Sequence, residues 1–347
     1  MERTIYIADI RSNSNKGMST GHFIPVAKMY QKIFIDNNVI IAGGPIYKKY
    51  FNEKELLALP YNVSSTRFID KIRTLKNCIK LFNTAKNQII ILQQSSTITA
   101  LLGILLFYHS KSKLYLIQYN HDCLKSSIGK TLYKFTKHKI NGIICPTLEL
   151  GEIFNIPFCI VPDYIYTNEN IKNVEKDYDN TIYDFCILGR IAPEKGVIEC
   201  ARRFANTKYK IIIAGKPETK ELEDELKNIC SHTSNIELII NYISNEQYKH
   251  YLEQSKYALL NYQSVYSERS SGVVFDMLFN NVPVIGTKCK TLQFIEEKNL
   301  GYLYSDLKTF NPDIILNKKV YNQYLNNIIT YRDEHKTYIS KLKQWIL

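Results

Sequence analysis

The chain has 347 residues, 45% of them hydrophobic, and is therefore long enough to form two domains that each bury a core. Its longest apolar run, from Ile98 to Tyr108, is about half of the roughly 20 residues that a membrane helix needs, which favours a buried helix. The N-terminus carries charged residues and enters a strand pattern directly, so neither a signal peptide nor a transit peptide is predicted. The eight cysteines form no C-x-x-C pair, which indicates a reduced, cytoplasmic chain without a thiolate metal site.

The net charge of +12 is concentrated in the first half of the chain. Up to Asp163 there are 21 Lys and Arg against 10 Asp and Glu, and after it there are 24 against 23. Nucleic acid, an anionic membrane surface and an anionic substrate could each attract this excess. No DNA- or RNA-binding motif appears, and aromatic residues are not interleaved with basic runs, so nucleic acid is not an expected partner.

Short β-branched runs alternate with longer segments of helical periodicity in the first half of the chain. We expect strands at 4–8, 38–43, 88–94, 113–120 and 142–146, and helices at 22–35, 66–85, 97–109 and 125–138. The run 158–164 ends this series. Such a βαβ series predicts a mostly parallel sheet with helices on both faces.

The same pattern starts again after a polar stretch at 168–180. We expect strands at 183–190, 209–215, 235–240, 257–262 and 282–287, and helices at 195–205, 218–231, 245–255, 271–280 and 314–347. The fold class is therefore α/β, with two Rossmann-like, doubly wound parallel-sheet domains at 1–163 and 164–315. Residues 316–347 form a helical segment that we expect to pack back on the N-terminal domain. The strand carboxyl ends of two such domains face a ligand-binding cleft.

A phosphate-binding pattern follows the first strand of the second domain, where residues 188–196 read LGRIAPEKG. Arg190 would stand at the end of a strand and Lys195 at the start of a helix, where backbone N–H groups favour an anion. Two fixed cations there would hold a diphosphate and neutralise the charge that develops on it as a leaving group. A surface loop with solvated charges is the simpler alternative.

The sequence GRIAPEKG resembles the GR-x-x-x-EKG signature of retaining glycosyltransferases with the GT-B fold, especially glycosyltransferase family 4. The family's E-x7-E element, which precedes a Gly-x-Pro-Val turn, is matched by Glu268-x7-Asp276 and then NNVPVIGT. The resemblance implies that Arg190 and Lys195 hold the donor diphosphate. It also implies that Glu268 lies against the transferred sugar and Asp276 contacts the ribose, while N–H groups of Ser270, Ser271, Gly272 and Val273 bind the phosphates.

Two departures from the family pattern alter the expected contacts. Asp276 stands where the family has Glu and is one methylene shorter, so the ribose contact is either closer or mediated by water. The sequence ERSSG replaces the common Glu-Gly-Phe-Gly loop, which predicts a reshaped sugar pocket.

The resemblance extends to the first domain and to the nucleobase. His121, in the sequence QYNHDCL, matches the family's HD element, which implies a catalytic position beside the donor sugar or acceptor. Gly17 and Gly21 lie in a small-residue loop after the first strand, like the family's glycine-rich loop. Tyr242 and Ile243 are candidates for base contacts, with core packing as the alternative.

A basic amphipathic helix is predicted at 124–139. Leu124, Ile128, Leu132 and Phe135 repeat at helical spacing, and Lys130, Lys134 and Lys137 fall on the other side. This pattern is typical of a helix that packs its apolar stripe on a sheet and leaves lysines in solvent. The lysines could at the same time attract an anionic membrane surface.

The resemblance implies a retaining, metal-independent glycosyltransferase that needs no cofactor and uses a nucleotide diphosphate sugar as co-substrate. Its acceptor would be a glycan or lipid-linked saccharide of the cell-envelope type, reached from the cytoplasm or the inner face of the membrane. Another GT-B enzyme, such as a nucleotide-sugar epimerase or an inverting transferase, is the first alternative. A non-catalytic basic binding module is the second.

Overall fold

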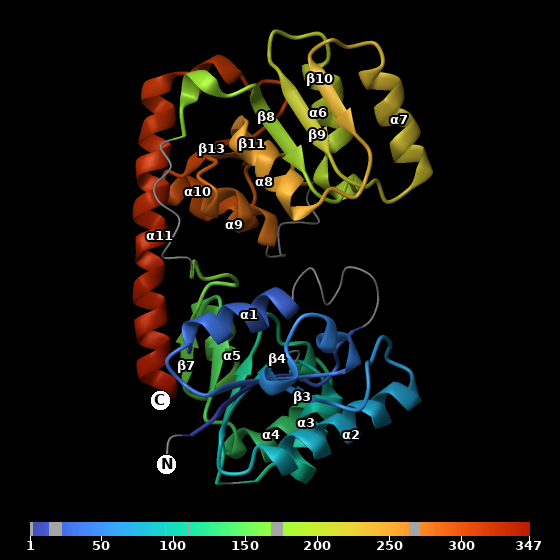
Figure 1. Cartoon of the computed structure of the whole chain (residues 1–347), viewed down its shortest axis with the longest axis vertical. Helices are drawn as coiled ribbons and strands as arrows, with labels where there is room; N and C mark the ends of the chain where they lie inside the picture. Colours follow the sequence, from blue (N-terminus) through green and yellow to red (C-terminus); the bar gives the residue numbers. More distant parts are fainter. Residues whose placement is uncertain (1–2, 14–22, 94, 110, 168–175, 264–270) are drawn as a thin grey trace. The chain divides into compact units, whose positions relative to one another are not determined.

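A computed structural model describes residues 3–13, 23–93, 95–109, 111–167, 176–263 and 271–347. The chain divides into two compact units, each with its own sheet (Figure 1). The first unit consists of Met1–Thr167 with His335–Leu347, and the second of Asn168–Glu334. The last helix, α11 (Lys318–Ile346), therefore contributes residues to both units.

The first unit has a seven-stranded sheet in the order β3-β2-β1-β4-β5-β6-β7, with parallel pairing throughout the described strands. The strands are β1 (Ile5–Asp9), β2 (Val39–Gly43), β3 (Leu56–Ala58), β4 (Ile89–Gln93), β5 (Lys113–Ile117), β6 (Gly142–Cys145) and β7 (Phe158–Ile160). The chain winds outward from β1 to β3 and then crosses back to β4. The winding direction thus reverses between β1 and β4, which makes their carboxyl ends the topological switch point of this sheet.

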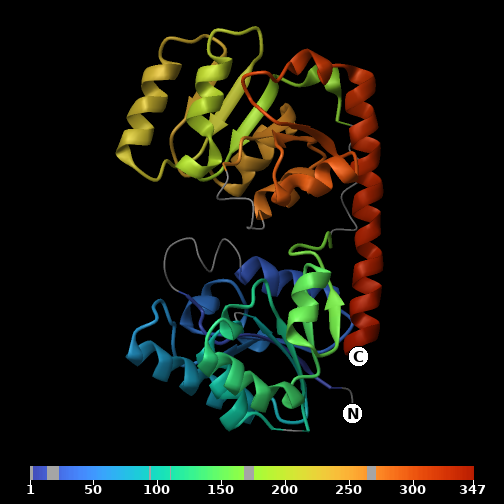
Figure 2. The ribbon, with the colours of Figure 1, turned by 180° about the vertical axis from the view of Figure 1, so that it is seen from behind.

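Helices cover both faces of this sheet. They are α1 (Ile24–Ile33), α2 (Phe68–Thr84), α3 (Ile98–Phe107), α4 (Ser127–Thr136) and α5 (Leu148–Phe154). One core packs α2, α3, α4 and α5 against the sheet, and the other packs α1 and the last turns of α11 on the opposite face. Both views show the end of α11 beside β7 (Figures 1 and 2).

The second unit repeats this design with six strands in the order β10-β9-β8-β11-β12-β13, again in parallel pairing. The strands are β8 (Tyr183–Leu188), β9 (Ile211–Ala214), β10 (Ile236–Ile239), β11 (Ser255–Leu260), β12 (Val284–Thr287) and β13 (Gly301–Tyr304). The helices are α6 (Val197–Phe204), α7 (Lys220–Cys230), α8 (Asn245–Glu253), α9 (Gly272–Phe279) and α10 (Gln293–Glu297). Helices α6 and α7 cover one face and α8, α9 and α10 the other, so this sheet has its switch point between β8 and β11.

Short 3₁₀ helices occur in the connections. They are η2 (Pro45–Lys49), η3 (Glu53–Glu55), η4 (Asp122–Leu124), η5 (Lys137–Lys139), η6 (Tyr178–Asn180), η7 (Pro193–Lys195), η9 (Lys290–Leu292) and η10 (Pro312–Ile314).

The inner face of α4 differs from the one that its apolar periodicity predicts. Its buried residues are Gly129, Tyr133 and Thr136. Tyr133 fixes this orientation because its hydroxyl donates to the Phe154 carbonyl at 2.6 Å. The prediction of an inward apolar stripe is therefore wrong for Ile128 and Phe135, which are 66% and 55% exposed.

The contact of α11 with the first unit supplies a stability prediction. Leu342 is fully buried in the core beneath α1, so Leu342→Ala should lower the free energy of unfolding of this unit by about 2–4 kcal/mol. Urea unfolding followed by the fluorescence of Trp345, the single tryptophan, measures it. Gln344→Ala, on the exposed side of the same turn, is the control. Equal stability of the two variants would show that α11 does not support this core.

Candidate functional site

The candidate site lies at the switch point of the second sheet. Arg190 comes two residues after β8 ends, and Lys195 is the last residue of η7, directly before the turn into α6. The neighbouring strand β11 ends at Leu260, and the N–H of Gln263 just beyond it donates to the Glu194 carbonyl at 2.9 Å. Ligands of open α/β sheets bind where two such strand ends meet, so the sequence-predicted cation pair occupies the expected position.

The segment after β8 is joined along its length to the segment after β9. Ile191 pairs with Pro217 in an isolated parallel bridge, and its N–H donates to the Lys216 carbonyl at 3.0 Å. Gly215 lies so close to Gly189 that a Cβ on it would stand 1.7 Å from the Gly189 carbonyl oxygen. Because any side chain would separate the two segments, glycine at 215 is required for this arrangement.

The turn that carries Lys195 is fixed against the end of β11. Gly196 has φ +58°, and a Cβ there would lie 2.3 Å from the Asn261 carbonyl oxygen. The Asn261 amide donates to the Gly196 carbonyl at 3.2 Å, and its side-chain oxygen accepts from Thr287 at 2.9 Å and from Tyr304 at 3.0 Å. Asn261 is buried, so these contacts satisfy an amide that water does not reach.

The charges at this turn balance one another. The Arg190 guanidinium donates through one terminal nitrogen to Glu194 at 2.6 Å and through the other to Glu218. Half-buried Lys195 is near them. Desolvation, followed by the charge of Arg190, lowers the pKa of Lys195 to about 8, and the charges of Glu194 and Glu218 partly oppose this shift. Two cations and two carboxylates form a cluster of zero formal charge.

The N-terminus of α9 lies next to the same strand end. Ser271 is the residue before α9, but its hydroxyl hydrogen bonds with Tyr262 at 2.6 Å and does not cap the helix. The first-turn N–H groups, those of Gly272 and Val273, therefore have no side-chain cap from Ser271. Asp276 is one turn further along the same side of α9. As a residue Asp276 is exposed, yet the surrounding protein atoms desolvate its carboxyl and raise its pKa to about 6.

The two candidates for base contacts behave differently. Tyr242 follows β10 and is 83% exposed, so core packing is wrong for this residue and its ring is available for stacking. Ile243 is half-buried and packs against the core formed with α8 and α9, as its alternative interpretation predicts.

The remaining candidates belong to the first unit or lie outside the described residues. His121 directly precedes η4, in the loop after β5, and is half-buried. Asp122 forms an exposed ion pair with Lys125 at 2.7 Å. Glu268, Ser270, Gly17 and Gly21 lie outside the residues that the structure describes.

Two residues that sequence motifs did not identify belong to this site. Glu218 follows a predicted strand end in the sequence AGKPET, and an acid in that place is the signal that could have identified it. Asn261 is a polar residue at the end of an apolar strand, in the sequence YALLNY. Each reaches the cation-bearing turn through a contact between strand ends that sequence spacing does not reveal.

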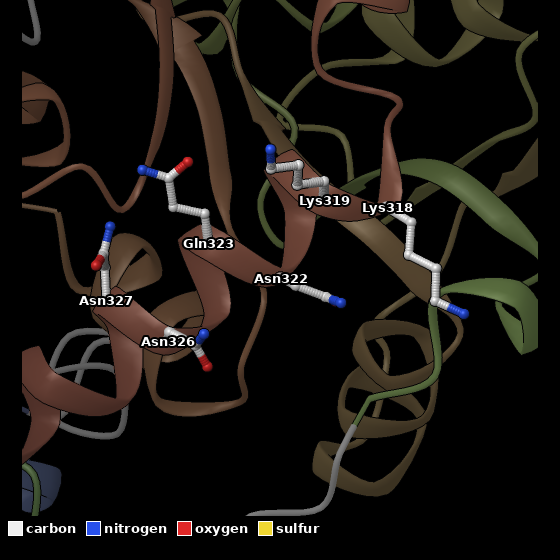
Figure 3. Close-up of a pocket in the computed structure, with 6 residues that line it drawn as sticks. All are labelled: Lys318, Lys319, Asn322, Gln323, Asn326 and Asn327. Atoms are coloured by element: carbon white, nitrogen blue, oxygen red, sulfur yellow. The ribbon is translucent and has the colours of Figure 1, made fainter.

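A hollow lies on α11, in the second unit. Figure 3 shows its six lining residues along this one helix: Lys318, Lys319, Asn322, Gln323, Asn326 and Asn327. The Asn327 amide donates to the Asn299 carbonyl at 2.9 Å, just before β13 begins. The hollow therefore lies at the amino-terminal edge of the sheet, opposite the candidate site.

The described residues contain no group of three or more His, Cys, Asp or Glu with a geometry suited to a metal ion. Among the helices of these residues, none combines the length and the apolar character needed to cross a membrane.

No protein-family model and no curated protein matches the chain, but solved structures do. HepE from Anabaena, solved in complex with UDP and glucose, has 12% identity and a TM-score of 0.65, with 99% of each chain covered. Sucrose-phosphate synthase from Thermosynechococcus elongatus has 12% identity and a TM-score of 0.66, covering 99% of this chain and 98% of its own. WaaG, a glycosyltransferase of lipopolysaccharide biosynthesis, has 12% identity and a TM-score of 0.58, covering 98% of this chain and 99% of its own.

These matches extend over nearly the whole chain and include both sheets. The predicted fold class is confirmed, and the resemblance to GT-B glycosyltransferases is supported by solved structures. The chain has the GT-B fold.

Proposed function

We propose that the chain is a retaining, metal-independent glycosyltransferase that uses a nucleotide diphosphate sugar. The observation that carries this proposal is the turn with Arg190 and Lys195, held at the switch point of the second sheet in a GT-B fold. Its chemistry suits a diphosphate because a guanidinium and an ammonium stand beside N–H groups at the start of α9. HepE was solved with UDP and glucose, which supports a donor of the same class.

In the proposed reaction the bond between the anomeric carbon and the diphosphate oxygen breaks, and the electron pair leaves with the diphosphate. The acceptor hydroxyl bonds to the anomeric carbon on the same face, and its proton passes to the departing diphosphate oxygen. Arg190 and Lys195 stabilise the charge that develops there. By the family resemblance, Glu268 and His121 position the sugar, Asp276 binds the ribose, and Tyr242 and Ile243 lie at the base.

We propose a glycan or lipid-linked saccharide of the cell-envelope type as the acceptor, used at the inner face of a membrane. The support comes from α4, where exposed Ile128 and Phe135 accompany exposed Lys130 and Lys134. Peripheral membrane helices typically combine two kinds of side chain: apolar ones that enter the lipid interface and lysines that attract anionic headgroups. Lys137, half-buried at the start of η5, adds to the same basic segment.

The function is tested by transfer assays with a panel of sugar nucleotides and extracted lipid-linked saccharides, in excess EDTA. We expect transfer with one donor, retained anomeric configuration in the product and a turnover that falls tenfold to a thousandfold in Arg190→Ala. Arg190→Lys should recover only part of this loss because it lacks the planar fork. Inverted product would identify an inverting transferase, and donor epimerisation without transfer an epimerase. An Arg190→Ala enzyme with wild-type turnover would remove the diphosphate assignment.

The pKa of Lys195 predicts how donor affinity depends on pH. In the empty site Lys195 is charged below about pH 8 and neutral above it, and a bound diphosphate favours the charged form. UDP affinity should therefore fall by about tenfold or more between pH 7 and pH 9.5. Arg190 keeps its charge over this range, and the terminal phosphate of UDP stays ionised. Calorimetric titration with UDP, or with the nucleoside diphosphate of the identified donor, measures it.

The matched variants for this pH profile are Lys195→Met and Lys227→Met. The first should bind weakly at every pH without the fall above pH 8. The second removes an exposed lysine of α7 that pairs with Glu223, and it should keep the wild-type profile. A wild-type affinity that does not change up to pH 9.5 would contradict the role of Lys195.

Membrane binding is tested by flotation with vesicles that contain about 30% phosphatidylglycerol. Replacement of both Ile128 and Phe135 by Ser should lower vesicle binding by about tenfold or more, since each side chain loses apolar area that enters the lipid. The control replaces Ile182 and Ile314, which are similarly exposed in the second unit, by Ser. Equal vesicle binding by the two double variants would show that α4 is not the membrane-binding surface.

A further inference from the structure

Both ends of the Arg190 guanidinium are engaged by carboxylates of the chain itself. One terminal nitrogen donates to Glu194 at 2.6 Å, and the other donates to Glu218. A diphosphate binds a guanidinium through these same terminal N–H groups. The oxygens of Glu194 and Glu218 therefore take up donors that the phosphate oxygens need.

The position of Glu218 is fixed by the backbone. Its N–H donates to the Ile191 carbonyl at 3.0 Å, and the preceding Pro217 pairs with Ile191 in the parallel bridge. Ile191 directly follows Arg190, so the segment that carries Glu218 is attached to the segment that carries the guanidinium. This contact is built into the ends of two adjacent strands, β8 and β9.

The two carboxylates differ in how easily they can release Arg190. The side chain of Glu194 is 20% exposed and that of Glu218 is 37% exposed. Glu194 belongs to the turn that is tied to β11 through Gln263, whereas the Glu218 side chain borders solvent. A partly exposed carboxylate loses little free energy when it leaves an ion pair and is hydrated instead. Glu218 is therefore the carboxylate that exchanges.

The exchange alters the charge that an incoming anion meets. With both carboxylates in place, Arg190 and Lys195 are balanced by Glu194 and Glu218, and the cluster has no net charge. When Glu218 turns outward, the remaining groups carry one positive charge beside the N-terminus of α9. Like charges a few ångströms apart repel, so a bound diphosphate and an inward Glu218 disfavour each other.

We propose that Glu218 competes with the donor diphosphate for Arg190, limits the affinity for nucleoside diphosphates, and returns to the guanidinium as the product leaves. This inference rests on the proposed function, because it takes the turn with Arg190 and Lys195 to be the diphosphate site. It assigns a role to a residue outside the GR-x-x-x-EKG signature. Removal of the Glu218 carboxylate should therefore strengthen binding, which is the opposite of what the loss of a ligand contact would do.

The test is calorimetric titration of the full chain with UDP, GDP, ADP, CDP and dTDP, continued with the tightest binder. Glu218→Gln and Glu218→Ala should each bind it about threefold to tenfold more tightly than wild type. The control is Glu225→Gln on α7. It also removes a carboxylate that pairs with an arginine, in this case Arg202 on α6. It should bind within twofold of wild type.

A double-mutant cycle separates competition from a general charge effect. In an Arg190→Ala background, Glu218→Gln should change affinity by less than twofold, because the shared partner is gone. If Glu218→Gln and Glu218→Ala bind as wild type or more weakly while Arg190→Ala still weakens binding, Glu218 orients the guanidinium and the inference is wrong. If wild type binds none of the five nucleoside diphosphates, both the inference and the proposed donor site are overturned.

Discussion

The geometry of the candidate site depends on the hydrogen bonds of the Asn261 side chain. Its one amide connects three places at the carboxyl edge of the second sheet: the turn at Gly196, Thr287 at the end of β12, and Tyr304 at the end of β13. Because Asn261 is buried, each contact that is lost would leave a polar group without water. The cations of the turn are positioned by this network and by the close approach of Gly196 to β11.

The electrostatics of the turn follow from the same packing. Lys195 is desolvated because the turn lies against the strand ends, and this lowers its pKa toward the physiological range. Arg190 remains more exposed and keeps its charge. One cation therefore responds to pH and the other does not, and both stand beside a helix N-terminus whose preceding serine is hydrogen bonded elsewhere. Lys195 is the more desolvated of the two cations, so water screens its attraction to a bound anion less than it screens that of Arg190.

Sequence patterns predict those parts of this fold in which the residue types of a segment match its burial in the folded unit. The β-branched runs predict both sheets because buried parallel strands need continuous apolar sequence. The patterns missed β3 and β13, which have three and four residues and lie at the edges of their sheets. They also gave α4 the wrong inner face, because Tyr133 reaches the Phe154 carbonyl and turns Ile128 outward.

The candidate site shows the same limit. Arg190 and Lys195 could be predicted because the signature that contains them is contiguous in sequence. Glu218 and Asn261 could not, since their contacts join residues that are 28 and 65 positions apart. Which strand ends become neighbours depends on the order of the strands in the sheet, and that order is a property of the whole unit.

The net charge of a unit does not predict the charge of the residues at the switch point of its sheet. At the switch point of the first sheet, Asp9 of β1 and Gln93 of β4 are register neighbours, and both are buried. Asp9 accepts from the Tyr47 hydroxyl at 2.9 Å. This edge therefore presents an acid and an amide, although the first half of the chain carries nearly all of the basic excess. Lysines of that excess lie on outer helices such as α4. The cations that suit a diphosphate belong to the second half of the chain, where 24 basic residues stand against 23 acidic ones.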